Sequence, residues 1–354
     1  MNIIYRDGQV FREHEILASE AAFSDESEGR RFSATPDILR NDYQRDRDRI
    51  LHSKAFRRLS HKTQVFIAAE GDHFRTRLTH TLEVAQIART IARALALNED
   101  LTEAIALGHD LGHTPFGHTG EEALSQSIAQ YRGIESFGSA GPSAQERAGL
   151  LFKHNEQSLR VVEVIEHNGS GLNLTYEVRD GIAHHSGAVR PDTLEGRIVS
   201  IADRIAYVNH DTDDAIRAGI LKEEDLPQST HELIGLTHSA RIETLVLSTV
   251  RTSASVGDIC MDQKTWDAMM ELRLYLFENV YRSPQVQSEM NKAKLLITQL
   301  FDYYMNHLDM VPDEFHAISE GDSLRAVTDY IASMTDRYAR NRFRDLFEPR
   351  SMQY

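Results

Sequence analysis

The chain has 354 residues and carries 39 Lys and Arg against 54 Asp and Glu, which gives a net charge of −15. This acidic balance argues against general coating of DNA and against attachment to an anionic membrane surface. A hydrophobic content of 41% is enough for a sizeable core. The only cysteine, Cys260, excludes an internal disulfide. Because no apolar run is long enough to span a membrane and the first seven residues lack a signal-peptide pattern, we expect a cytoplasmic protein.

Apolar residues recur at helical spacing along most of the chain, and alternating strand patterns are scarce. Residues 1–35 are polar and mixed, which predicts a weakly ordered arm or a short strand. A helix is expected over 42–66, and Thr76 or Thr79 is placed to cap the next one, which runs to about residue 97. A short extended segment is expected at 172–178. The remaining predicted helices are 98–111, 117–131, 154–166, 194–218, 240–252, 265–282, 286–308 and 323–345.

This pattern predicts a mainly α protein in three parts. Residues 1–40 form an N-terminal arm, residues 41–220 the main helical core, and residues 221–354 a helical region packed on that core. The one long Gly/Ser-rich stretch, residues 132–149, predicts a flexible loop or flap rather than a domain linker, because the helical pattern resumes directly after it.

The stretch 109–118 (HDLGHTPFGH) indicates a metal site at the end of an apolar helix. Unpaired polar groups are costly to bury, so such a density of titratable groups indicates function. Imidazole and carboxylate together bind first-row divalent metals. His109 and Asp110 need further ligands, for which His80 and Asp203 are the natural candidates. Taken singly, His80 could be a satisfied core histidine and Asp203 a buried salt-bridge partner, so only the set is specific.

These four residues resemble the metal signature of the HD superfamily of phosphohydrolases. Five ordered blocks extend the likeness to deoxyguanosine triphosphate triphosphohydrolase-like enzymes: residues 43–66, 77–84, 109–121, 154–160 and 201–214. The resemblance implies an HD-domain helical fold, here with additional C-terminal helices, and makes residues 41–220 an HD-type catalytic core. It also implies metal-dependent hydrolysis of a deoxynucleoside triphosphate (dNTP) to deoxynucleoside and triphosphate, by attack at the α-phosphorus.

Proton transfer to the leaving 5′-oxygen needs a donor. His118 and Glu121 stand three residues apart on one predicted helix, so the carboxylate can orient the imidazole and raise its pKa. We assign His118 as the general acid or nucleophile-activating group and Glu121 as its partner; an ordinary surface His–Glu pair is the alternative. The resemblance adds His154 to this group, and it places three residues at the phosphates: Arg77, His113 and Arg204.

Asp203, Tyr207 and Asp211 recur every four residues and share one helix face. The resemblance puts the Tyr207 ring against the deoxyribose, where it leaves little room for a 2′-hydroxyl. It makes Asp211 the acceptor for the 3′-hydroxyl and brings Gln64 to the sugar as well. Without the resemblance, Tyr207 reads as an ordinary core residue.

Two histidines with two aspartates suit Mn²⁺, the expected ion, and also Fe²⁺, Co²⁺ or Ni²⁺, whereas Mg²⁺ fits imidazole less well. The expected partners are the dNTP substrate, a dNTP or single-stranded DNA as effector, and further copies of the chain, but no membrane. One alternative is another HD-type nucleotide phosphohydrolase, which Gln64, Tyr207 and Asp211 in family register oppose. The other is a nucleotide- or single-stranded-DNA-binding regulator with weak catalysis, which the intact ligand set disfavours.

Overall fold

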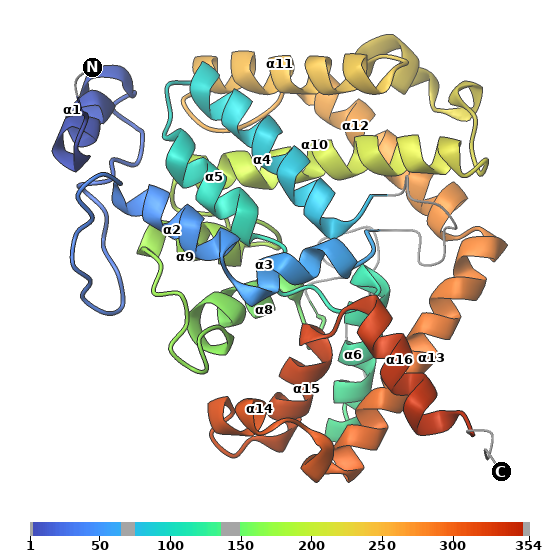
Figure 1. The fold of residues 1–354 in the computed structure, drawn as a ribbon. Coiled ribbons are helices and arrows are strands. Elements are labelled where there is room, and N and C mark those ends of the chain that lie inside the picture. Colours follow the sequence, from blue (N-terminus) through green and yellow to red (C-terminus); the bar gives the residue numbers. More distant parts are fainter. Residues whose placement is uncertain (1–2, 65–74, 136–148, 350–354) are drawn as a thin grey trace.

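The computed structural model describes residues 3–64, 75–135 and 149–349, and its regular structure is helical (Figure 1). Within these ranges there is no strand, and two isolated bridges pair Arg30 with Thr175 and Thr63 with Thr76. The predicted mainly α fold is therefore confirmed. Of the described helices, none combines the length and the apolar character needed to cross a bilayer.

The helices of the first part of the chain begin at side chains that satisfy their free backbone N–H groups. Thr76 accepts a hydrogen bond from the backbone of Thr79 at the start of α4, as one of the two predicted caps, and Thr193 caps α10 in the same way. The bounds are α1 (Arg6–Ile16), α2 (Asp42–Leu51), α3 (Lys54–Arg58), α4 (Arg77–Ala94), α5 (Glu99–Gly108), α6 (Gly117–Arg132), α8 (His154–Arg160), α9 (Tyr176–His184) and α10 (Leu194–Arg217). A π-helical turn, Val161–Ile165, extends α8.

The last third of the chain is also helical, with more breaks than predicted. The single helix expected over 323–345 is wrong, because the chain leaves the helix at Met334 and Thr335 caps a new one. The bounds are α11 (His238–Val256), α12 (Gln263–Leu276), α13 (Pro284–Asn306), α14 (Asp313–Ile318), α15 (Ser323–Ser333) and α16 (Asp336–Phe347). A π-helical turn, Phe277–Tyr281, continues α12.

Three other local predictions differ from the structure, wholly or in part. The arm forms helix α1, which is fixed to the protein through the buried carboxylate of Glu13: it accepts hydrogen bonds from Ser24 N at 2.8 Å and Asn41 Nδ2 at 2.7 Å. The extended segment expected at 172–178 is confirmed up to Thr175, which forms a bridge with Arg30, and is wrong from Tyr176 onward, where α9 begins. The single helix predicted over 42–66 is instead divided into α2, α3 and a short 3-10 turn that ends at His61, and residues 65–66 lie outside the described part of the chain.

Two apolar clusters organise these helices. The first joins α2, α4, α5, α9, α10, α11 and α12, which occupy the upper part of Figure 1. In the second, Leu124 and Ile128 of α6 pack with Leu300 of α13 and Ile331 of α15, in the lower part of the same view. Helix α6 therefore shares its core with the C-terminal helices. The division at residues 40 and 220 stays a prediction.

Candidate active site

The predicted metal ligands lie together where α4, α5 and α10 meet. His80 sits in the first turn of α4, His109 and Asp110 follow the last turn of α5, and Asp203 comes from the middle of α10. Nε2 of His80 is 3.1 Å from Oδ1 of Asp203 and 3.9 Å from Oδ2 of Asp110. Nε2 of His109 is 3.4 Å from Oδ1 of Asp110 and 3.8 Å from Oδ1 of Asp203. Residues far apart in sequence thus converge on one point.

This donor set fits a divalent cation. Nδ1 of His109 donates to the carbonyl of Ala106 at 2.6 Å, so Nε2 is the ring nitrogen that carries no hydrogen and keeps its lone pair. That Nε2 is buried and has no hydrogen-bond partner among the described residues, although it faces two carboxylates. A bare buried imidazole nitrogen beside carboxylate oxygens is the arrangement that a metal completes. His80, His109 and Asp110 are fully buried, so bulk water does not compete freely for the site.

The two acids remain carboxylates despite their surroundings. Burial alone raises the pKa of Asp110, but His109, His113 and Arg77 outweigh it and hold that pKa well below its usual range. For Asp203, burial acts in the same direction and is again outweighed, here by its contact with His80, so its pKa is also lowered. Ionised oxygens are the form that coordinates a cation.

Sequence reasoning missed a chain of groups behind His80. Nδ1 of His80 lies 3.5 Å from Nδ1 of His210, whose own Nε2 is 3.1 Å from Oε2 of Glu83, a contact that is bent away from an ideal hydrogen bond. Arg75 contacts the same carboxylate at 3.2 Å. Carboxylate–histidine contacts behind a ligand fix its orientation. The available signal was the position of Glu83, three residues after His80 on one helix face.

A second cluster forms around Glu121 on α6. Its Oε2 is 2.8 Å from Nδ1 of His118, as the spacing predicted, and its Oε1 is 3.1 Å from Nδ1 of His154. The backbone N–H of His154 donates to Oε1 as well, at 2.8 Å. Burial favours a neutral acid, yet His154 and His118 keep the pKa of Glu121 well below its usual range. In turn Glu121 raises the pKa of His154 against the effect of burial. The His118 side chain is 48% exposed and so faces the outside of the cluster.

His113 bridges the two clusters. Its Nε2 is 3.2 Å from Oδ1 of Asp110, and its ring stacks on His154 with centroids 4.0 Å apart and planes 10° from parallel. Burial and the nearby Arg77 lower the pKa of His113. Stacked rings direct their nitrogen lone pairs in parallel planes, so His113 and His154 are poorly arranged to hold one ion between them. Ligand atoms of His113, His118, Glu121 and His154 lie within 4.8 Å of one another, as in a metal site, but the stacking of two of these rings favours proton handling over a second metal.

Arg77 and the loop before α6 complete this arrangement. Nη1 of Arg77 donates to Oδ2 of Asp110 at 2.7 Å, and both side chains are buried. Gly112 is required by close packing, because a Cβ there would lie 2.2 Å from the backbone nitrogen of Ser158. Phe116 adopts a left-handed φ of 62° and donates its N–H to Asp336 at 3.0 Å. Helices α8 and α16 thus fix the backbone that carries the histidines.

The predicted sugar-binding residues extend from the metal cluster along α10. Asp211 is buried and accepts a hydrogen bond from the hydroxyl of Tyr281, and burial raises its pKa to about 7. Tyr207 is half-buried on the same helix, and the guanidinium of Arg273 lies 5.7 Å from its ring centroid. Tyr281, which reaches Asp211 from the π-helical turn after α12, was not among the predicted site residues.

Two other predicted residues lie at the margins of the cluster. Oε1 of Gln64 is buried without a hydrogen-bond partner among the described residues. Arg204 donates to the carbonyl of Ser200 at 3.1 Å and lies 6.0 Å from the Trp266 ring centroid. Of the predicted loop 132–149, residues 136–148 lie outside the described part of the chain.

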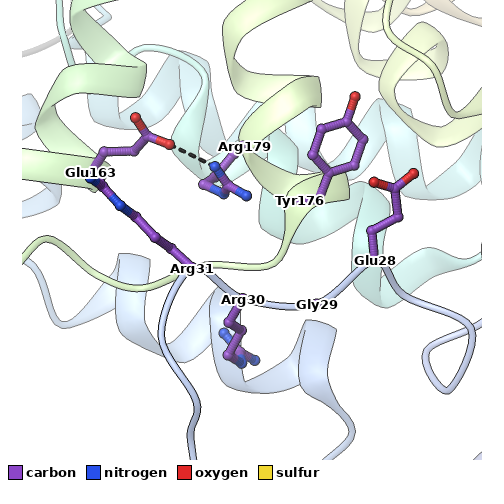
Figure 2. A pocket seen from close by; sticks show the side chains of 7 residues that line it. All are labelled: Glu28, Gly29, Arg30, Arg31, Glu163, Tyr176 and Arg179. Carbon is purple, nitrogen blue, oxygen red and sulfur yellow. Dashed lines mark hydrogen bonds and ion pairs between the residues drawn. The ribbon is translucent and has the colours of Figure 1, made fainter.

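Two surface pockets lie apart from these clusters. One, of about 430 Å³, is lined by Glu28, Gly29, Arg30, Arg31, Glu163, Tyr176 and Arg179 (Figure 2). Its positive charge is largely compensated, because Arg30 pairs with Asp42 and Asp46, and Arg179 pairs with Glu163. The other, of about 500 Å³, is mainly apolar and lies between α4 and α11. Neither contains a predicted site residue.

Comparison with known proteins agrees with the fold and the buried cluster. An HD domain model matches residues 77–208, and a phosphohydrolase-associated domain model matches residues 259–345. The helical fold and the His–Asp cluster thus define an HD-domain hydrolase. Relatives named "Deoxyguanosinetriphosphate triphosphohydrolase-like protein" match nearly the whole length. The one from Caldanaerobacter subterraneus is 52% identical over 338 residues, covering 95% of this chain and 94% of the relative.

Two further relatives with that name are each 47% identical. The Desulfatibacillum aliphaticivorans protein covers 96% of this chain and 97% of its own, and one from Clostridium perfringens covers 96% of both. The chain belongs to the deoxyguanosinetriphosphate triphosphohydrolase-like family. A crystal structure of a hypothetical protein from Aquifex aeolicus is more distant, with 16% identity and a TM-score of 0.40 over 86% of this chain and 68% of that one.

Proposed function

We propose that the protein hydrolyses deoxynucleoside triphosphates to deoxynucleoside and intact triphosphate, with water attacking the α-phosphorus. The observation that supports this most is the adjacency of the two clusters. A buried His–Asp set with a bare nitrogen lies beside a carboxylate-bound histidine that faces outward, and His113 connects them. Hydrolysis of a phosphate ester needs both an electrophilic centre and a proton donor.

His80, His109, Asp110 and Asp203 would hold the divalent ion, for which we propose Mn²⁺. When bound, the ion supplies Lewis-acid polarisation of a phosphoryl oxygen and lowers the pKa of water. The buried Arg77 beside Asp110 adds positive charge where the phosphoryl oxygens gain negative charge, and the neutral ring of His113 is proposed as a polar contact to the same phosphate.

The proton for the leaving 5′-oxygen is assigned to Nε2 of His118. Its Nδ1–H is bound by Glu121, so Nε2 is the ring atom directed away from that carboxylate. The anionic Glu121 favours the protonated ring and fixes its orientation. The half-exposed position of His118 allows it to meet a substrate.

The proposed sugar contacts explain selection of deoxy substrates. Asp211 offers a carboxylate oxygen, Oδ1, that is buried and has no hydrogen-bond partner among the described residues, and it suits a 3′-hydroxyl donor. Tyr207 lies one helical turn closer to Asp203, where its ring excludes a 2′-hydroxyl. Gln64 adds a second polar group to the same sugar.

We also infer that the chain self-associates and acts in the cytoplasm. Large apolar side chains are concentrated on the N-terminal region, where Ile3, Phe11, Ile16 and Ile38 are all more than 60% exposed. Light scattering at several concentrations tests this, and a monomer throughout would contradict it.

Product analysis tests the proposed reaction. The Mn²⁺-loaded protein is incubated with each dNTP and each ribonucleoside triphosphate, and triphosphate, pyrophosphate and orthophosphate are separated. Deoxynucleoside with intact triphosphate, formed faster from deoxy substrates, is expected. Pyrophosphate with a nucleoside monophosphate would favour another HD-type phosphohydrolase. Absence of turnover with dNTP or single-stranded DNA as effector would favour a binding regulator.

A further inference from the structure

His185 is a buried imidazole in the site to which neither the motifs nor the spacing assigned a role. It follows the last residue of α9 and is only 1% exposed. Its Nδ1 donates to the carbonyl of Ile182 at 2.8 Å, so its Nε2 is the nitrogen with a lone pair. That Nε2 lies 3.3 Å from Nε2 of His154.

The hydrogen bonds around His154 then determine where its protons are. Glu121 is an acceptor at Oε1, so Nδ1 of His154 carries a hydrogen, at a distance of 3.1 Å. Oγ of Ser186 also lies 3.5 Å from Nε2 of His154, at the limit of a hydrogen bond, so His185 is the nearer partner. Two facing ring nitrogens need one hydrogen between them, and His185 has placed its own on the far side. Nε2 of His154 therefore carries a hydrogen as well. Both N–H groups of His154 are used inside the protein.

We propose that His185 is a positioning residue that keeps His154 a double hydrogen-bond donor, so that Glu121 stays anionic and His118 alone presents a transferable proton to the substrate. This inference rests on the proposed function and changes one part of it. The resemblance grouped His154 with His118 and Glu121 as catalytic; His154 is here a fixed partner of Glu121 that transfers no proton itself. Loss of the acceptor at His185 frees the His154 ring to rotate and weakens the orientation of His118 through Glu121.

The same ring also touches the metal cluster. The centroid of His185 lies 5.0 Å from that of His109, edge to face. A change at His185 can therefore disturb a metal ligand by packing alone, and the test must separate the two effects. His185→Gln keeps an acceptor oxygen, whereas His185→Leu fills much of the space without one. The control is His184→Leu: His184 is adjacent in sequence, 35% exposed and bound to Asp180 at 2.6 Å, outside the site.

The kinetic test compares kcat, KM and bound Mn²⁺ in these variants with one dNTP as substrate. We expect His185→Leu to lower kcat by about 10–100-fold with KM and metal content within twofold of wild type. His185→Gln should recover most of that loss, and His184→Leu should behave as wild type. Unchanged kcat in His185→Leu, or equal losses in His185→Leu and His185→Gln that follow metal content, would overturn the proposal.

A second readout does not depend on catalysis. In metal-free protein labelled with ¹⁵N-histidine, His154 should give two ring N–H signals, identified by their absence in His154→Phe. The Nε2–H signal should disappear in His185→Leu and persist in His185→Gln. Only one ring N–H signal for His154 in wild type would overturn the proposal. If the wild type hydrolyses no dNTP, the proposed function fails while these signals still decide the role of His185.

Discussion

Asp211 makes stability depend on pH in a way that can be calculated. The side chain is buried on α10, and burial raises its carboxyl pKa to about 7. In the unfolded chain a carboxyl of this type titrates near pH 3.9, so about three units separate the two states. Because the folded state binds this proton more tightly, its contribution to stability is fully present below the unfolded pKa. That contribution is lost as the pH rises through the folded pKa.

The size of this contribution follows from the slope of the unfolding free energy against pH. Between about pH 5 and pH 7 the folded carboxyl holds a proton that the unfolded one has lost, and about 1.36 kcal/mol per pH unit over roughly two units gives about 2.7 kcal/mol. Asp211→Asn keeps the shape of the side chain and removes the titration. We expect the free energy of unfolding to fall by about 2–3 kcal/mol more in the wild type than in the variant from pH 5 to pH 8.

Urea titration of metal-free protein at both pH values measures this difference, because all other groups titrate in both proteins. Asp302→Asn, an exposed carboxylate on α13, is the matched control and should follow the wild type. Equal pH dependence in the wild type and Asp211→Asn would refute the reasoning. The same variant should lose kcat/KM for dNTPs at pH 8, where it is relatively stabilised, because its neutral amide has a single acceptor oxygen in place of the two anionic oxygens that Tyr281 and the proposed 3′-hydroxyl would share.

Three further predictions concern the two clusters. Asp110→Ala removes a ligand, so bound Mn²⁺, measured by elemental analysis, and turnover should both be lost; stoichiometric tight metal in this variant would exclude Asp110 from the ligand set. His118→Ala should bind metal and dNTP normally while kcat falls by about 10²–10⁴-fold, and an unchanged kcat would remove His118 from the mechanism. Glu83→Gln weakens the group behind His210 and should lower metal affinity about tenfold in competition with a chelating dye. If Glu83→Gln binds the metal with wild-type affinity, the contact between Glu83 and His210 does not influence the metal ligands.

Local sequence patterns predicted the helices that carry the ligands. The apolar spacing predicted a helix over 194–218, and α10 runs from Leu194 to Arg217 with Ile198, Ile201 and Ile205 buried. Helix α1 has no such signal, because only Glu13 is buried in it and tertiary hydrogen bonds hold it. The run before α9 stays extended and pairs Thr175 with Arg30, but the helix begins at Tyr176, within the segment expected to be extended, so the boundary was misplaced.

In the site, too, only contacts within one helix could be predicted from local spacing in the sequence. The bond between His118 and Glu121 follows from a spacing of three residues on one helix. The partners of His185 and His210 stand 31 and 130 residues away in the chain, so no local spacing marks either one. A histidine whose partner comes from another helix becomes visible only when the helices are packed.

The central claim is that water attacks the α-phosphorus and the 5′-oxygen leaves. Hydrolysis of a dNTP in ¹⁸O-labelled water, followed by mass spectrometry and ³¹P NMR of both products, tests this directly. The account predicts one ¹⁸O in the triphosphate, on the phosphorus that had been bonded to the sugar, and none in the deoxynucleoside. Label in the deoxynucleoside, in orthophosphate or in pyrophosphate would contradict it.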